Sequence, residues 1–137
     1  MRKLTGKVRA GWGVASPNLN LILGLLQERT GFPSLITGTL NIEMDTHFPV
    51  THDAFIEREE YNNSEYIKLQ RCRVQGRRAF IMRPEWHEQE VEGPRWRFLE
   101  LMSDIHLRTC LALTTGDLIE VEVEGDEEWW TEPKGPE

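Results

Sequence analysis

The feature that most constrains the fold is a series of short segments in which apolar and polar residues alternate, separated by turn residues. Residues 66–74 alternate in this way, and Gln75 and Gly76 then turn the chain into an apolar run at residues 79–82. Residues 118–123 alternate again after a turn. A period of two gives a strand one face toward a core and one toward solvent. The chain is therefore predicted to build its core mainly from short strands.

The remaining segments complete this prediction. Strands are expected at residues 4–10 and 96–102, and a turn plus a strand at residues 35–44. Residues 45–63 are polar without a strong period, which predicts a long loop with room for one short strand. A last strand is expected at residues 118–123.

Two helices are predicted. Residues 18–29 carry leucines and an isoleucine at helical spacing, with Ser16 or Asn18 as alternative N-caps and Gly31 as the stop signal. A shorter helix is expected to begin at a cap on either Ser103 or Asp104 and to run to about residue 110. Many short strands, two helices and no repeated strand–helix–strand unit favour a small closed or nearly closed barrel.

Composition places these elements in one domain. The chain has 137 residues, of which 39% are hydrophobic and 28% charged, enough for a single core. We expect the domain to cover residues 1–125 and an acidic, tryptophan-containing tail to cover residues 126–137. Cys72 and Cys110 are far apart in sequence and have no metal-ligand spacing, so both are predicted to be reduced core thiols.

Charge and hydropathy exclude some partners. The net charge of −7 argues against a general nucleic-acid binder, which needs a basic face to neutralise phosphates. No apolar run approaches the roughly 20 residues that span a bilayer, and no apolar segment follows the basic N-terminus. A cytoplasmic protein without a membrane partner is the simplest expectation, and the oligomeric state is not predicted.

One loop could bind an anion. The segment Gly11-Trp12-Gly13-Val14-Ala15-Ser16 lies between the first predicted strand and the first helix. Backbone N–H groups at such a place can hold phosphate, although two close glycines also occur in ordinary tight turns. The nucleotide-binding loop with the pattern Gly-x-x-x-x-Gly-Lys-Ser/Thr is absent, as are the protein-kinase motifs.

Two further segments carry a resemblance to a known family. The first is Thr37-Gly38-Thr39-Leu40-Asn41, and the second covers residues 99–108 and continues into residues 111–121. In this order and at this spacing, they resemble the CTP-dependent riboflavin kinases, a mostly archaeal family. The resemblance extends over about residues 6–125. It implies a six-stranded cradle-loop barrel with one helix after the first strand and a short helix before the last strand.

The resemblance also implies a reaction, in which the γ-phosphoryl group of CTP is transferred to the 5′-hydroxyl of riboflavin to give FMN. Thr39 and Asn41 match the residues that hold Mg²⁺ in the family, and Glu100 matches a glutamate that contacts the flavin and could position the acceptor hydroxyl. The residues that match nucleotide contacts are Gly11, Trp12, Gly13, Val14, Ala15, Ser16, Ile105, His106, Leu107 and Arg108.

Each assignment has a simpler alternative. Thr39 and Asn41 could bond a neighbouring loop, Glu100 could be a solvated strand carboxylate, and Arg108 could pair with Asp104 on the helix surface.

This chain also departs from the family at two places. Ala15 replaces the third glycine of the nucleotide loop, and the loop at residues 84–94 holds four glutamates and no threonine. Both departures fall where a substrate would be contacted. They leave two other functions open, a ligand- or nucleotide-binding protein without catalysis and a kinase for another acceptor.

Overall fold

The computed structural model describes residues 2–10, 19–36, 39–45, 50–85 and 97–123. Its elements, in chain order, are β1 (Arg2–Arg9), α2 (Leu23–Thr30), β2 (Leu40–Glu43), β3 (Ala54–Ile56), the 3₁₀ helix η1 (Arg58–Tyr61), β4 (Ile67–Val74), β5 (Arg77–Pro84), β6 (Phe98–Met102), α4 (Leu107–Cys110) and β7 (Leu118–Val123). Short strands dominate, as the alternation predicts.

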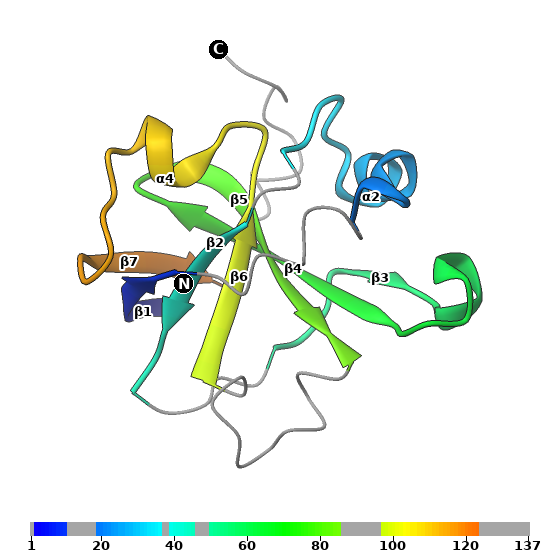
Figure 1. Ribbon diagram of the computed structural model, residues 1–137, viewed down its shortest axis with the longest axis horizontal. Coiled ribbons are helices and arrows are strands. Elements are labelled where there is room, and N and C mark those ends of the chain that lie inside the picture. The colour runs from blue at the N-terminus through cyan, green and yellow to red at the C-terminus, as the bar shows by residue number, and fades with distance from the viewer. Residues whose placement is uncertain (1, 11–18, 37–38, 46–49, 86–96, 124–137) are drawn as a thin grey trace.

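The strands form a closed antiparallel barrel (Figure 1). The sheet order is β3-β4-β5-β6-β2-β1-β7, and pairing of β4 with β7 joins the ends, so that six strands close and β3 remains on the edge of β4. Closure removes the exposed strand edges that would otherwise invite pairing with other chains. The predicted six-stranded barrel with two short helices is confirmed.

The barrel interior is apolar because every barrel strand turns alternate side chains inward. The interior core takes Leu40 and Ile42 from β2, and Leu99 and Leu101 from β6. Side chains at the intervening positions of these two strands face outward. The direct cross-strand partners Asn41 and Glu100 therefore lie side by side on the outer surface of the barrel.

A second core covers part of that outer surface. Leu26 of α2 packs with outward-facing residues of β4, β5 and β6, including Leu69, Phe80 and Met102. Figure 1 shows α2 and β3 on one side of the molecule and α4 on the opposite side. The outer face of the barrel is thus apolar beneath α2 and polar where β2 meets β6.

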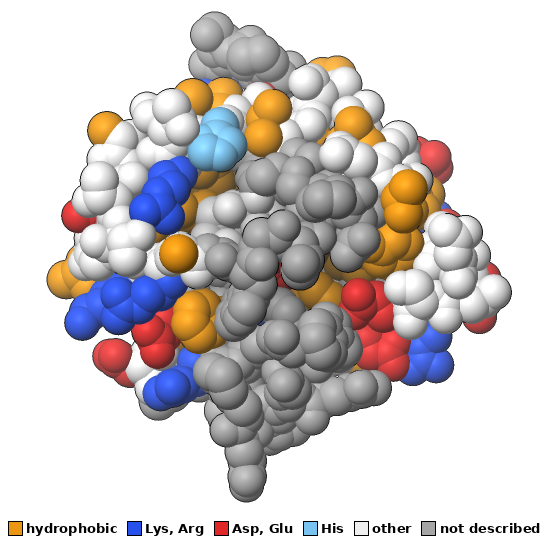
Figure 2. All heavy atoms as spheres, in the orientation of Figure 1, with side chains coloured by type: hydrophobic (Ala, Val, Ile, Leu, Met, Phe, Trp, Pro, Cys, Tyr) orange, Lys and Arg blue, Asp and Glu red, His pale blue; other side chains and the backbone are white. Residues whose placement is uncertain are grey.

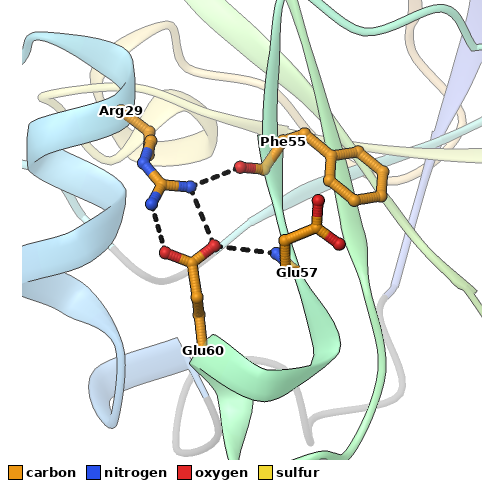
Figure 3. Close-up of polar contacts among 4 residues, drawn as sticks. All are labelled: Arg29, Phe55, Glu57 and Glu60. Atoms are coloured by element: carbon orange, nitrogen blue, oxygen red, sulfur yellow. Dashed lines mark hydrogen bonds and ion pairs between the residues drawn. The ribbon is translucent and has the colours of Figure 1, made fainter.

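Ion pairing fixes α2 to β3 and η1 (Figure 3). Arg29 Nη1 donates to Phe55 O at 2.6 Å and to Glu60 Oε1 at 3.0 Å, and Nη2 also bonds the Glu60 carboxylate. Glu60 Oε1 in addition accepts the Glu57 backbone N–H at 2.9 Å. We call this group, formed by Arg29, Phe55 O, Glu57 N and Glu60, the helix clamp.

Local signals located the turns better than the helix starts. Gly31 ends α2 with φ 75°, as predicted, and Gln75 and Gly76 both have positive φ in the β4–β5 hairpin. Residues 19 and 20 are helical, but α2 itself begins at Leu23. The alternative N-caps Ser16 and Asn18 lie outside the described residues.

The start predicted for the second helix is wrong. The N-cap of α4 is His106, whose Nδ1 accepts the Thr109 backbone N–H at 3.3 Å. Ser103 Oγ instead donates to Arg78 O at 2.8 Å, and Asp104 forms an ion pair with Arg77 at 2.9 Å. Tertiary partners therefore take both of the residues that the local pattern offers as caps.

The cysteine prediction is half right. Cys72 is buried inside the barrel, whereas Cys110 at the end of α4 is exposed. Burial also raises the pKa of the Cys72 thiol. In the described part of the chain, no helix has the length and apolar character needed to cross a membrane.

Candidate functional site

Three oxygen-bearing side chains meet on the outer surface where β2 begins and β6 ends. Thr39 immediately precedes β2, Asn41 lies within it, and Glu100 is the direct partner of Asn41 on β6. Thr39 Oγ1 donates a hydrogen bond to Glu100 Oε1 at 3.2 Å. We call Thr39, Asn41 and Glu100 the strand-end cluster. It brings together three of the residues selected from sequence, across a separation of 61 positions between Thr39 and Glu100.

Asn41 and Glu100 are buried although they face outward from the barrel, and Thr39 is half-buried. Asn41 is 7% exposed and Glu100 is 5% exposed. Glu100 is thus not a solvated strand carboxylate, which removes the simpler alternative for this residue. Within the described ranges, Asn41 Oδ1 is buried and has no hydrogen-bond partner. A buried acceptor left in this state costs about 1–3 kcal/mol, which is a reason to look for a ligand at this oxygen.

The donor set of the cluster fits a hard divalent cation. A hydroxyl, an amide oxygen and a carboxylate are the kinds of ligand that Mg²⁺ and Ca²⁺ take, and Thr39 and Asn41 share a face because they are two residues apart. Among the residues that the structure describes, no group of three or more His, Cys, Asp or Glu side chains could hold a metal. Thr39 and Asn41, which are predicted to hold Mg²⁺, thus carry oxygen ligands of the kind that Mg²⁺ takes, and they lie beside the Glu100 carboxylate.

Arg108 provides positive charge near the same end of the barrel. Its Nη2 donates to Thr115 Oγ1 at 2.6 Å and its Nη1 to Arg9 O at 3.5 Å. Arg9 is in turn the cross-strand partner of Asn41 on the other side of β2. Asp104, the partner that the simpler alternative gave to Arg108, pairs with Arg77 instead. The Arg108 contacts are with neutral oxygens, which leave its charge available to an anion.

The other residues of the second segment divide by burial. Leu107 is part of the interior core and Ile105 packs against that core, so their side chains serve the barrel. His106 is exposed, and its Nδ1 also lies 2.7 Å from Thr109 Oγ1. Of the four residues predicted to contact a nucleotide here, only His106 and Arg108 have side chains outside the interior core.

The rest of the predicted nucleotide site, Gly11 to Ser16, lies outside the described residues. The first described segment, residues 2–10, ends at Ala10, directly after Arg9. Because Arg9 pairs with Asn41, the connection from β1 into this segment starts next to the strand-end cluster.

Glu85, the first glutamate of the acidic loop at residues 84–94, forms an ion pair with Arg58. Arg58 Nε donates to Glu85 Oε1 at 2.7 Å, and the backbone N–H of Tyr66 donates to the same oxygen at 3.1 Å. The hydrogen bond from Arg58 lowers the pKa of the Glu85 carboxyl. Glu85 is therefore held by η1 and by Tyr66, the residue that precedes β4. The other three glutamates of this loop lie outside the described residues.

Positive side chains are exposed on the side of the molecule where α4 lies. In Figure 2, Lys and Arg side chains gather on the side of the molecule where β1, β7 and α4 lie, with acidic side chains between some of them. Arg9 Nε, for example, donates to Glu43 Oε1 at 2.8 Å. A chain with net charge −7 thus still presents positive side chains on the side of the molecule where α4 lies.

The contact that sequence reasoning missed is the one between Thr39 and Glu100. Each residue was selected separately, one for a metal and one for a flavin. Their proximity follows from the register of β2 on β6, which no local pattern reports. No protein-family model matches this chain, and no curated protein is significantly similar to it.

Proposed function

We propose that this chain is a phosphotransferase that uses CTP to convert riboflavin into FMN. The proposal rests on the resemblance of its two motifs to the CTP-dependent riboflavin kinases. The observation that supports it most is the strand-end cluster. There Asn41, whose buried amide oxygen has no hydrogen-bond partner among the described residues, is the cross-strand partner of Glu100, and Glu100 bonds the Thr39 hydroxyl. Phosphoryl transfer needs few covalent steps from a protein and depends on positioning and charge neutralisation.

In this proposal, Thr39 and Asn41 hold Mg²⁺ with their side-chain oxygens. When bound, the cation neutralises charge on the nucleotide phosphates. Arg108 supplies a second, fixed positive charge, anchored by Thr115 Oγ1 and Arg9 O. Neutral protein ligands suit a cation whose positive charge is balanced mainly by a polyphosphate.

Glu100 acts on the acceptor. A carboxylate next to the metal ligands can orient the 5′-hydroxyl of riboflavin and accept its proton. The hydroxyl oxygen then forms a bond to the γ-phosphorus, while the bond between that phosphorus and the β–γ bridging oxygen breaks and CDP leaves. The 3.2 Å contact between Thr39 Oγ1 and Glu100 Oε1 supports this assignment, because the carboxylate lies beside a residue that we assign to Mg²⁺.

The test is FMN formation. Purified protein is incubated with riboflavin, CTP and Mg²⁺, with ATP in a parallel reaction, and FMN is separated by chromatography. We expect FMN with CTP, and its loss in Thr39→Val. Thr5→Val is the matched control because Thr5 is an exposed strand threonine opposite Glu120. Absence of FMN with either nucleotide, from protein shown to be folded, would contradict the proposal.

Nucleotide binding then shows whether the remaining alternatives include a nucleotide as ligand. CTP–Mg²⁺ binding that weakens in Thr39→Val, without FMN formation, would favour a kinase for another acceptor or a nucleotide-binding protein. Absence of nucleotide binding would favour a barrel that binds a different ligand.

A further inference from the structure

We infer that Glu100 is itself a ligand of the divalent cation, so that the strand-end cluster binds the metal before any nucleotide arrives. The inference deepens the proposed function, because it assigns a third protein ligand to the same site. It adds to the role proposed above for Glu100, because Oε1 would face the cation and the second carboxylate oxygen would serve the acceptor hydroxyl.

The first argument is distance. Thr39 Oγ1 and Glu100 Oε1 are 3.2 Å apart. Two neighbouring ligand oxygens on an octahedral cation, each at about 2.0–2.1 Å, are separated by about 3 Å. The two side chains therefore already have nearly the spacing that a shared cation would require. Only the hydroxyl proton, which now points to the carboxylate, would have to turn away.

The second argument comes from Asn41. Its Oδ1 is buried and, within the described part of the chain, has no hydrogen-bond partner. Asn41 is the direct cross-strand partner of Glu100, so both side chains leave the sheet on the same outer face. A buried amide oxygen next to a buried carboxylate is a pair of ligands that a divalent cation would satisfy.

The third argument is charge. Thr39 and Asn41 are neutral, so with these ligands alone a cation would depend on the nucleotide phosphates for its binding. Glu100 adds one negative charge at 5% exposure, where the attraction is less screened than at the surface. With this charge the protein can hold the cation by itself, through one hydroxyl, one amide and one carboxylate oxygen.

The test uses Mn²⁺ as the probe, in the absence of nucleotide and riboflavin. Free Mn²⁺ is followed by electron paramagnetic resonance during titration into the full chain. We expect one bound Mn²⁺, displaced by Mg²⁺, with the affinity at least tenfold weaker in Glu100→Gln. Glu120→Gln is the matched control, since Glu120 is an exposed strand glutamate on β7. It should bind Mn²⁺ as the unaltered chain does.

Two results would overturn the inference. One is unaltered Mn²⁺ binding in folded Glu100→Gln, and the other is no Mn²⁺ binding by the unaltered chain until a nucleotide is added. A second measurement covers the case in which Glu100→Gln does not fold. In the unaltered chain, Mn²⁺ should broaden the amide NMR signals of Thr39, Asn41 and Glu100 first, and broadening that starts elsewhere would also overturn it.

Failure of this inference can be told apart from failure of the proposed function. FMN formation by a chain that binds no Mn²⁺ without nucleotide would overturn the metal assignment of Glu100 and leave the kinase standing. Mn²⁺ binding that depends on Glu100, in a chain that makes no FMN, would support the metal assignment and remove the kinase.

Discussion

The helix clamp and the strand-end cluster are both polar groups on the outside of the barrel, but their hydrogen bonding differs. In the helix clamp, the Arg29 guanidinium bonds Glu60 and Phe55 O, and Glu60 also accepts the Glu57 backbone N–H. In the strand-end cluster, Asn41 Oδ1 is buried and, among the described residues, has no partner. The polar atoms of the helix clamp thus bond one another within the fold, whereas the Asn41 amide oxygen of the strand-end cluster remains available to a ligand.

This difference suggests which group serves stability and which serves binding. Hydrogen bonds that are complete within the chain connect elements, as Arg29 connects α2 to β3 and η1. A buried polar atom without a partner lowers stability, and a ligand or ion that binds it is one reason for a fold to retain it. The following experiments test this division, from the largest expected effect to the smallest.

Asn41→Ala should separate function from stability most clearly. It removes the unpartnered amide oxygen, so we expect FMN formation to fall by about 100-fold or more. The thermal midpoint should stay the same or rise, because a buried unsatisfied acceptor disappears. Steady-state rates and thermal unfolding measured on the same preparation check both expectations. A large loss of stability would mean that Asn41 is structural, and Asn41→Asp, which keeps an oxygen there, should retain more activity.

Gly6→Val should have the opposite signature. A Cβ atom at Gly6 would lie 2.9 Å from Met44 Sδ and 3.1 Å from Glu43 O, so a larger side chain would overpack the interior of the barrel. We expect a loss of about 1–3 kcal/mol in the free energy of unfolding, with activity per folded molecule retained. Denaturant titration measures this loss.

Gly24→Ala is the control for that substitution. Among the described residues outside the helix's own backbone and the chain neighbours, no atom lies within 4 Å of a Cβ at Gly24, and alanine favours the helix over glycine. It should be neutral or stabilising. Equal destabilisation by the two substitutions would contradict the packing argument.

Acid should weaken the pairs that are complete within the fold. The hydrogen bonds from Arg29 and Arg58 lower the pKa values of Glu60 and Glu85 below the ordinary 4.5. A carboxyl whose pKa is lower in the folded state than in the unfolded state stabilises the protein at pH values above its unfolded-state pKa. This contribution is lost as the pH falls through the folded-state pKa. The thermal midpoint of the unaltered chain should therefore exceed that of the double variant Glu60→Gln, Glu85→Gln at pH 7, and the difference should shrink below about pH 4.5. A constant difference from pH 7 to pH 3 would show that these pairs do not stabilise through charge.

Thiol labelling reports whether the site variants leave the barrel closed. Cys110 is exposed and should react rapidly with a thiol reagent in the native protein. Cys72 lies inside the barrel, where burial raises its thiol pKa, and should react only on unfolding. We expect the same pattern in Asn41→Ala, whereas Gly6→Val should label Cys72 faster. Rapid native labelling of both cysteines in the unaltered chain would contradict the closed interior.

The local parts of the fold could be predicted from the sequence alone. Alternation with period two predicted β4 and β7, and paired turn residues predicted the hairpin at Gln75 and Gly76. Gly31 predicted the end of α2. These features depend on residues close together in the chain, where backbone preferences and side-chain periodicity act directly. The three residues of the strand-end cluster were also selected from sequence, through the two motifs.

Only the tertiary structure decided which of these residues act together. The register of β2 on β6 places Glu100 against Asn41 and within hydrogen-bond distance of Thr39. The fold also decided that Ser103 and Asp104 bond to β5 rather than cap a helix, and that Cys110 is exposed. The contacts of Glu100, Ser103 and Asp104 join residues far apart in the chain, and a one-residue shift in strand register would break each of them. A sequence pattern can therefore select residues for a site, but barrel closure determines which oxygens share it.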